Sequence, residues 1–217
     1  MRFVGADMGV AYDGDADRCL AVDAQGNLVD GDQIMGLLAV GMKEDGTLAS
    51  DTLVVTVMSN LGLLLAMRER GIRVVQTGVG DRYVLEAMRR SRARLGGEQS
   101  GHIIADAFTR TGDGLCTALL LLNALKDLGE DVDTLVDRFG RYPQKLSNLT
   151  LAPGCRLDME RVGEIAEEVQ QGMCGRGRVL VRPSGTEPLL RILVEARDEP
   201  LVDEVFERLI ARLKAYC

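Results

Sequence analysis

Short apolar runs alternate with longer amphipathic segments over the first two thirds of the chain. Runs of β-branched and apolar residues predict strands, and apolar residues recurring every three or four positions predict helices. The predicted strands are 8–12, 19–23, 28–29, 52–58, 74–77, 93–95 and 102–105, and the predicted helices are 33–42, 61–70, 82–90, 115–128 and 132–139. The residues predicted to cap or end these helices are Asp32, Asn60, Asp81, Gly71 and Gly129. This alternation predicts an α/β fold with a partly parallel sheet.

The pattern changes near Arg141-Tyr142-Pro143, where we place a domain boundary. Beyond this point the predicted elements are strands at 145–151, 178–182 and 189–196 and helices at 159–171 and 201–216. Two strand-pair units, each with a helix against one face, predict a small α+β domain. The chain is therefore divided into residues 1–31, 32–141 and 142–217.

The 217-residue chain carries a net charge of −7, which argues against nucleic acid as a partner. It contains no window of about 18 apolar residues, so no membrane span and no membrane partner are predicted. Its first residues lack the apolar stretch of a signal peptide. The cysteines are odd in number, five, and form no C-x-x-C pair, which argues against a disulfide framework and a zinc site. We therefore expect a cytoplasmic protein.

Three carboxylates, Asp13, Asp15 and Asp17, alternate directly after the first predicted strand, and Arg18 follows them. Carboxylates this close repel one another unless a cation lies among them. Oxygen ligands suit a hard divalent ion, so the run predicts a Mg²⁺ site on a loop at the end of a strand. The alternative is a solvated acidic turn. A calcium EF-hand loop does not fit, because Arg18 stands where that loop needs Gly and Ala24 where it needs Glu.

A second candidate site lies where a predicted strand ends at Arg182 and is followed by Ser184, Gly185 and Thr186. Gly185 allows a positive φ, which lets successive backbone N–H groups point into one concavity. The two hydroxyls and the guanidinium groups of Arg182 and Arg191 suit a phosphate group. The alternative is an ordinary hairpin turn.

The third candidate stretch contains Glu98, Ser100 and His102, which is the only histidine of the chain. On an extended segment these three side chains would share one face, where they could hydrogen-bond sugar hydroxyls. The alternative is a surface acid at Glu98 and a structural, half-buried histidine at His102.

A glycine-containing turn over residues 77–82 is predicted between a strand and a helix. Its helix N-terminus favours an anion, which makes Gly78 and Asp81 candidate ligand contacts. The G-x-G-x-x-G spacing of a dinucleotide-binding site is absent. A tight turn with Asp81 as a cap explains the same residues.

Four motifs, in order, resemble those of the α-D-phosphohexomutases. They are Asp13–Arg18 with Val29–Gln33, Gly80–Val84, Gly97–His102 and Arg182–Pro188. Within that family, Gly80–Val84 and Thr111–Gly114 are most similar to the phosphoglucosamine mutases of bacteria. The resemblance covers essentially the whole chain. The family's chains are longer, and the present sequence resembles their C-terminal half.

The resemblance implies a role for each candidate residue. Asp13, Asp15 and Asp17 would bind Mg²⁺, and Arg18 would contact a phosphoserine beside it. Glu98 and Ser100 would hold the sugar, and His102 would orient groups or shuttle a proton near the reacting centre. The loop with Arg182, Ser184, Gly185, Thr186 and Arg191 would hold the non-reacting phosphate. Residues 1–31 would then be a remnant of the metal-loop domain, 32–141 a sugar-binding domain and 142–217 a phosphate-binding domain.

The implied reaction interconverts glucosamine 6-phosphate and glucosamine 1-phosphate through a 1,6-bisphosphate. A phosphomannomutase or phosphoglucomutase and a non-catalytic phosphosugar- or metal-binding module are the alternatives. The family's phosphoserine lies in a Ser-His-Asn stretch, which this sequence does not contain. We therefore expect the chain by itself to be inactive. We also expect the apolar residues of strands 8–29 to promote self-association or docking with the missing N-terminal half.

Overall fold

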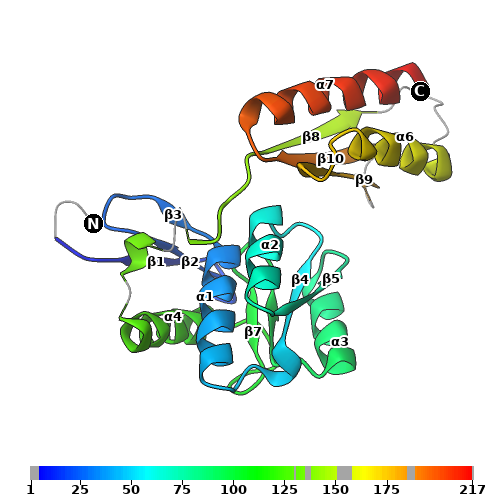
Figure 1. The fold of residues 1–217 in the computed structure, drawn as a ribbon. Helices are drawn as coiled ribbons and strands as arrows, with labels where there is room; N and C mark the ends of the chain where they lie inside the picture. Colours follow the sequence, from blue (N-terminus) through cyan, green and yellow to red (C-terminus); the bar gives the residue numbers. More distant parts are fainter. Residues whose placement is uncertain (1–4, 130, 135–137, 151–157, 185–188, 217) are drawn as a thin grey trace. The chain divides into compact units, whose positions relative to one another are not determined.

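The structure, a computed structural model, describes residues 5–129, 131–134, 138–150, 158–184 and 189–216 (Figure 1). The chain divides into two compact units, residues Met1–Arg141 and Tyr142–Cys217. Each unit is described by itself below. None of the helices in the described ranges combines the length and the apolar character needed to cross a membrane.

The first unit begins with a small antiparallel sheet of order β1-β2-β3. Its strands, all predicted from the sequence, are β1 (Gly9–Tyr12), β2 (Cys19–Val22) and β3 (Leu28–Val29). Ala21 and Val29 are buried in the main core of the unit. Val10 and Tyr12 lie on the same face as Ala21 and Cys19, with which they pair, but on the edge strand they stay 40% and 41% exposed. Leu28 is on the opposite face and is 46% exposed.

A four-stranded sheet of order β5-β4-β6-β7 forms the centre of the first unit. Strand β4 is parallel to β5 and β6, and β6 is antiparallel to β7, which confirms the predicted partly parallel sheet. The strands are β4 (Thr52–Thr56), β5 (Arg73–Thr77), β6 (Leu95–Gly97) and β7 (Ile103–Ala105). The helices are α1 (Gly31–Glu44), α2 (Leu61–Glu69), α3 (Asp81–Ser91) and α4 (Gly114–Leu128), with 3₁₀ turns at Ala49–Asp51 and Val132–Thr134.

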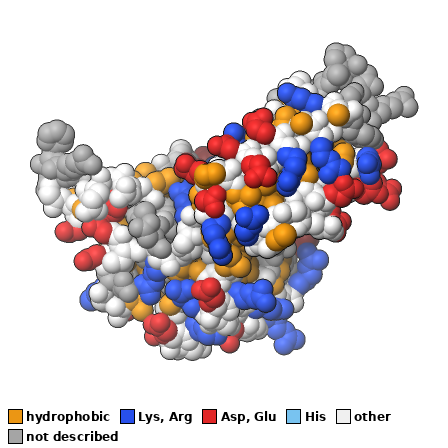
Figure 2. All heavy atoms as spheres, turned by 45° about the horizontal axis from the view of Figure 1, so that its top comes forward, with side chains coloured by type: hydrophobic (Ala, Val, Ile, Leu, Met, Phe, Trp, Pro, Cys, Tyr) orange, Lys and Arg blue, Asp and Glu red, His pale blue; other side chains and the backbone are white. Residues whose placement is uncertain are grey.

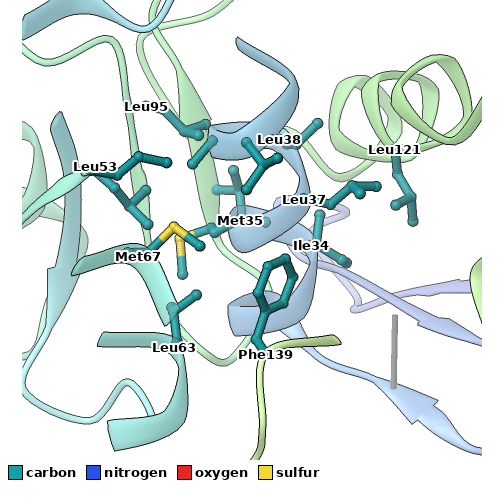
Figure 3. Close-up of a cluster of buried hydrophobic side chains, with 14 of the residues drawn as sticks. Ile34, Met35, Leu37, Leu38, Leu53, Leu63, Met67, Leu95, Leu121 and Phe139 are labelled. Atoms are coloured by element: carbon teal, nitrogen blue, oxygen red, sulfur yellow. The ribbon is translucent and has the colours of Figure 1, made fainter. Parts of the chain in front are cut away.

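The core of this unit surrounds α1, which is buried on every side from Gly31 to Val40 (Figure 3). Leu37 and Met35 of α1 are fully buried, as are Leu53 of β4, Met67 of α2 and Leu121 of α4. Burying each such side chain contributes roughly 1.5–3 kcal/mol. Helix α1, which begins in the stretch Asp30-Gly31-Asp32, is therefore firmly packed and supports the loops beside it.

The start of α1 differs from the sequence prediction. Asp30, not Asp32, is the N-cap: its side chain accepts hydrogen bonds from the backbone N–H of Asp32 and Gln33, and Gln33 Oε1 accepts from the backbone of Asp30 at 2.8 Å. This reciprocal pair is a capping box. Asp32 instead accepts the backbone N–H of Asn60 at 2.7 Å.

Four further helix ends were predicted. Gly71, predicted to stop α2, directly follows the C-cap Arg70 and has a φ of +67°. Asn60 caps α2 and Gly129 ends α4 in a left-handed conformation, as predicted. Asp81 is the first residue of α3 and not its cap, which is Gly80 without a side-chain hydrogen bond. The helix predicted over 132–139 begins only as a 3₁₀ turn at Val132–Thr134, and residues 135–137 lie outside the described ranges.

The second unit is one antiparallel sheet of order β8-β10-β9 with two helices. Its elements are β8 (Gln144–Thr150), α6 (Met159–Gln171), β9 (Gly177–Pro183), β10 (Leu189–Ala196) and α7 (Glu199–Tyr216). Both helices and the central strand contribute to a single core, so the predicted two strand-pair units are wrong. The α+β character is confirmed. Arg178 of β9 forms an ion pair with the buried Glu195 of β10.

Candidate functional site

The acidic loop is the connection between β1 and β2. A turn closes it, because the backbone N–H of Ala16 donates to the carbonyl of Asp13 at 3.1 Å. Arg18 folds back on the same residue: its backbone N–H donates to Asp13 Oδ1 at 3.3 Å and its Nε lies 3.7 Å from Asp13 Oδ2. The Arg18 side chain is half exposed, so its guanidinium can also reach a ligand at the loop.

His102 joins the acidic loop to the Glu98–His102 segment. Its Nδ1 lies 3.0 Å from Asp17 Oδ2, and its Nε2 accepts the backbone N–H of Gly112 at 3.2 Å. Because Nε2 is an acceptor, the ring proton is on Nδ1 and is donated to Asp17. The imidazole is buried, with 6% of the residue exposed. The structure therefore brings together two motifs that are 85 residues apart in the sequence.

The environment of Asp17 favours its charged form. Burial alone would raise the pKa of this carboxyl, but hydrogen bonds with Asp13 and His102 and the charge of Arg18 hold it below its usual value.

The donor chemistry of Asp13, Asp15 and Asp17 fits a hard divalent ion, since all the available ligands are carboxylate oxygens. The arrangement is not closed around one point. Within the described parts of the chain, no three acidic, histidine or cysteine side chains gather closely enough to hold a metal ion. Asp13 is engaged by Arg18 and Asp17 by His102, which explains why the predicted ligands do not converge.

The segment that contains Glu98, Ser100 and His102 is a tight turn, not the extended segment on which the three side chains would share one face. Backbone hydrogen bonds of 3.0 Å join Glu98 to His102 and Gly101 to Glu98, and Gly101 has a φ of +94°. The three side chains therefore do not share one face. Glu98 and Ser100 still meet, because Ser100 Oγ donates to Glu98 Oε2 at 3.2 Å.

Glu98 is held at the mouth of a hollow of about 360 Å³. Its Oε1 accepts the backbone N–H of Gly80 at 2.9 Å, which fixes the carboxylate to the loop before α3. Ser100 lines the same hollow, together with apolar side chains from the β2 and β4 regions. The remaining lining residues are Leu20, Leu28, Asp30, Thr56, Met58, Val79, Gln99 and Arg141.

Two charged residues of this hollow were not predicted from the sequence. Arg141 Nη2 lies 3.5 Å from Asp30 Oδ2, and Gln99 Nε2 donates to the same oxygen at 3.3 Å. Burial raises the pKa of the Asp30 carboxyl, although the Arg141 guanidinium acts in the opposite direction. The available signal was Asp30 in the Val29–Gln33 stretch, because a buried carboxylate needs a partner; the side chain of Arg141, which is 45% exposed, supplies it.

Two predicted contacts lie elsewhere in the first unit. Gly78 lines a separate hollow between β5 and α3, and Asp81 begins α3, where its Oδ1 accepts the backbone N–H of Arg82 at 2.7 Å. Neither residue lines the hollow of Glu98.

In the second unit, Arg182 of β9 and Arg191 of β10 are directly opposite each other in the antiparallel register. Burial and the charge of Arg191 lower the pKa of Arg182, which means that the environment disfavours two cations. The backbone N–H of Ser184 donates to the carbonyl of Leu189 at 2.9 Å, which continues the pairing of β9 with β10 by one residue. Gly185 and Thr186, also predicted as phosphate contacts, lie outside the described residues.

Comparison with known proteins relates both units to one family. The description "phosphoglucomutase/phosphomannomutase, alpha/beta/alpha domain III" matches residues 30–142, and the C-terminal domain of the same family matches residues 152–212. The phosphoglucosamine mutase of Desulforudis audaxviator is 51% identical over 207 residues, which cover 95% of this chain and 46% of the relative. The phosphoglucosamine mutase of Bacillus subtilis is 48% identical over 206 residues, covering 94% of this chain and 46% of that protein.

A solved structure of Aspergillus fumigatus N-acetylphosphoglucosamine mutase, in complex with GlcNAc-6P and magnesium, has the same fold. It matches with a TM-score of 0.76 and 22% sequence identity, over 97% of this chain and 49% of that one. The present chain thus spans about half the length of the curated relatives it matches.

Proposed function

Because the chain belongs to the phosphoglucomutase/phosphomannomutase family, we propose that it contributes the metal loop, the sugar pocket and a phosphate site to a phosphosugar mutase. The reaction would interconvert glucosamine 6-phosphate and glucosamine 1-phosphate through a 1,6-bisphosphate. One observation carries this proposal: the His102–Asp17 hydrogen bond holds the acidic loop beside the turn that bears Glu98 and Ser100. A metal ion and a sugar could therefore be bound next to each other.

At the acidic loop, Asp13, Asp15 and Asp17 would hold Mg²⁺. When bound, such an ion neutralises charge on a transferring phosphoryl group. The half-exposed guanidinium of Arg18 would contact the same group from the other end of the loop. This assignment draws support from the oxygen-only donor set and from the magnesium complex of the fungal relative.

His102 would act as a positioning residue. Its Nε2 already accepts the Gly112 N–H, so the ring has no free acceptor for a proton in this arrangement. Its Nδ1–H can only hold Asp17 in place. We therefore favour the orienting role of His102 over proton shuttling.

Glu98 and Ser100 would grip the sugar hydroxyls in the 360 Å³ hollow. Glu98 and Asp30 bring two carboxyl groups to this hollow against the single guanidinium of Arg141. A sugar with an ammonium group gains more from such a surface than one with a hydroxyl at the same place. This charge balance favours glucosamine phosphate over glucose or mannose phosphate.

The phosphate that does not react would bind in the second unit. Arg182 and Arg191 are opposite each other, and an anion between them would offset their repulsion. Ser184 would add a hydroxyl, and the sequence adds Gly185 and Thr186. Titration of glucosamine 6-phosphate into the chain and into Arg182→Ala tests this. We expect the variant to bind about ten- to hundredfold more weakly, as for one lost charge-assisted hydrogen bond; equal affinities would contradict the assignment.

The phosphoryl donor implied for this family is a serine in a Ser-His-Asn stretch, and the 217 residues contain no such stretch. We therefore expect the chain by itself to bind substrate without turnover, with or without added glucose 1,6-bisphosphate. Sustained interconversion by the pure chain would contradict this expectation.

A chimera separates a mutase from a non-catalytic binding module. The chain would replace the matching stretch of the Bacillus subtilis relative, whose remaining part stays unchanged. A mutase function predicts turnover of glucosamine 6-phosphate by the chimera and its loss in Asp17→Asn. Binding without turnover in a folded chimera would favour the module. Higher turnover of glucose or mannose phosphates would favour the other mutases of the family.

Self-association also remains part of the proposal. Strand β1 is an edge strand, with Val10 and Tyr12 exposed at 40% and 41%. An exposed apolar edge is a template for pairing with another chain. Light scattering on Val10→Lys should show smaller particles than the unchanged chain if this edge mediates association, and identical particles would exclude it.

A further inference from the structure

A second hollow in the first unit has a charge opposite to that of the whole chain. It has a volume of about 600 Å³ and lies between the edge strand β5 and helix α3. Arg73, Arg90 and Arg92 line it, and the described residues that line it include no Asp or Glu. The chain overall has 33 acidic and 26 basic residues. Figure 2 shows Lys and Arg side chains gathered at the lower right, the side on which Figure 1 draws α3 and β5.

The topology places the three guanidinium groups at one end of this hollow. Strands β5 and β6 are both parallel to β4, so α3, which connects them, runs back in the opposite direction. The last turn of α3, with Arg90, and Arg92 just beyond it therefore return to the end of the sheet where β5 begins at Arg73. Tyr83, in the first turn of α3, and Gly78 lie at the other end.

Weak contacts hold two of these arginines, and a ligand could replace the one made by Arg90. Arg73 donates through Nε to Thr52 Oγ1 at 3.2 Å, which fixes the direction of its guanidinium. Arg90 lies 3.6 Å from Glu86 in a pair with side-chain exposures of 76% and 50%. Exposed pairs of this kind contribute little, so a phosphate group can displace Glu86 easily.

The opposite end of the hollow offers an aromatic surface. Tyr83 is 52% exposed. Part of its ring packs on the glycine loop, since a Cβ on Gly78 or Gly80 would lie 3.8 or 3.3 Å from Tyr83 Cδ2. The rest of the ring faces the hollow, where a planar base could stack on it.

Because this hollow, the β5–α3 groove, has three arginines at one end and an aromatic ring at the other, we propose that it binds a nucleoside polyphosphate. The phosphates would lie at the three arginines and the base on Tyr83. The five residues of β5 separate the two ends by about 13 Å. A single phosphate group cannot occupy both ends, whereas a base joined to a chain of phosphates can. The site is separate from the hollow of Glu98 and does not depend on the proposed mutase function.

Calorimetric titration of the 217-residue chain with ATP, AMP and tripolyphosphate, without divalent ions, tests the proposal. ATP should bind saturably, and AMP and tripolyphosphate should each bind about tenfold more weakly, because each lacks the contacts of one end. Arg90→Gln should weaken ATP binding by about tenfold or more. Arg89→Gln is the matched control: it removes the same charge from the same helical turn, but Arg89 does not line the groove.

Tyr83→Leu isolates the aromatic end. It should weaken ATP binding by about tenfold and leave tripolyphosphate binding unchanged. Arg182→Ala, in the second unit, should leave ATP binding unchanged. All of these side chains are partly or largely exposed, so circular dichroism should show folded variants. The proposal is overturned by absence of saturable ATP binding, by equal effects of Arg89→Gln and Arg90→Gln, by equal losses of ATP and tripolyphosphate in Tyr83→Leu, or by loss of ATP binding in Arg182→Ala.

Discussion

The pair formed by Arg182 and Arg191 predicts that one substitution changes stability and binding in opposite directions. Arg191→Gln removes one of two like charges that are directly opposite on β9 and β10. Such a cross-strand arrangement destabilises a sheet by roughly 0.2–1 kcal/mol. The lowered pKa of Arg182 has the same cause together with burial, so removal of the second charge relieves a real cost. The free energy of unfolding of Arg191→Gln should therefore exceed that of the unchanged chain by about 0.5 kcal/mol.

The same substitution should weaken phosphosugar binding. A guanidinium that binds a phosphate contributes roughly 1.5–3 kcal/mol, which corresponds to a ten- to hundredfold change in the dissociation constant of glucosamine 6-phosphate. Urea denaturation followed by circular dichroism measures the first quantity, and calorimetric titration measures the second. A substitution that merely loosens the sheet lowers both the free energy of unfolding and the affinity. A higher free energy of unfolding together with a lower affinity therefore identifies two arginines that are placed to bind an anion.

Arg178→Gln is a matched control on the same strand. Arg178 is paired with Glu195, which has no exposed surface. Removing one partner of a buried pair costs about 3–5 kcal/mol. This variant should be less stable, with unchanged affinity where it remains folded. If Arg191→Gln is also destabilised, or if it binds glucosamine 6-phosphate as tightly as the unchanged chain, the assignment of the anion to the Arg182–Arg191 pair is refuted.

Four further predictions concern the first unit. Burial raises the pKa of the Cys19 thiol from 9.0 to about 11, so above pH 9 the unfolded chain loses this proton while the folded chain keeps it. The free energy of unfolding should therefore fall by about 2 kcal/mol between pH 9 and pH 11. Cys19→Ala should lack this part of the decrease. Gly36→Ala should be destabilised by about 1–3 kcal/mol, because its Cβ would lie 2.6 Å from the Phe139 ring. Gly41→Ala, in the same helix with its Cβ 4.0 Å from Leu128, should instead be stabilised by about 0.5–1 kcal/mol, and equal denaturation midpoints would contradict both expectations. Asp15→Asn should weaken Mg²⁺ binding measured by calorimetry, and unchanged affinity would remove Asp15 from the ligand set.

Local patterns predicted most of the elements because each depends on neighbours in the sequence. Met159–Gln171 and Leu189–Ala196 were predicted with their observed bounds, since their amphipathic and apolar patterns run uninterrupted between clear stops. The cap of α1 was assigned to Asp32 because Asp30 and Asp32 have the same local chemistry. Only the contact of Asp32 with Asn60, 28 residues away, decides between them.

In the candidate site, too, local sequence predicted the residues but not the contacts between distant segments. The residue types of the acidic loop and of the Glu98–His102 turn were predicted, but their geometry was not, because it depends on contacts between distant segments. Glu98, Ser100 and His102 would share one face of an extended segment, yet the turn at Gly101 directs His102 toward Asp17. No pattern within either segment contains that pairing.

The glycines of Thr111–Gly114 show where the long-range information lies. A Cβ on Gly112 would be 2.4 Å from His102 Cε1, and one on Gly114 would be 2.5 Å from the carbonyl oxygen of Arg18. Both distances are shorter than van der Waals contact, so any larger residue would force the acidic loop or the imidazole to move. These two glycines, at the start of α4, are therefore required by the close approach of the acidic loop, His102 and the Thr111–Gly114 segment. Such a signal can be interpreted only when the fold is known, because each glycine alone is equally consistent with a flexible loop.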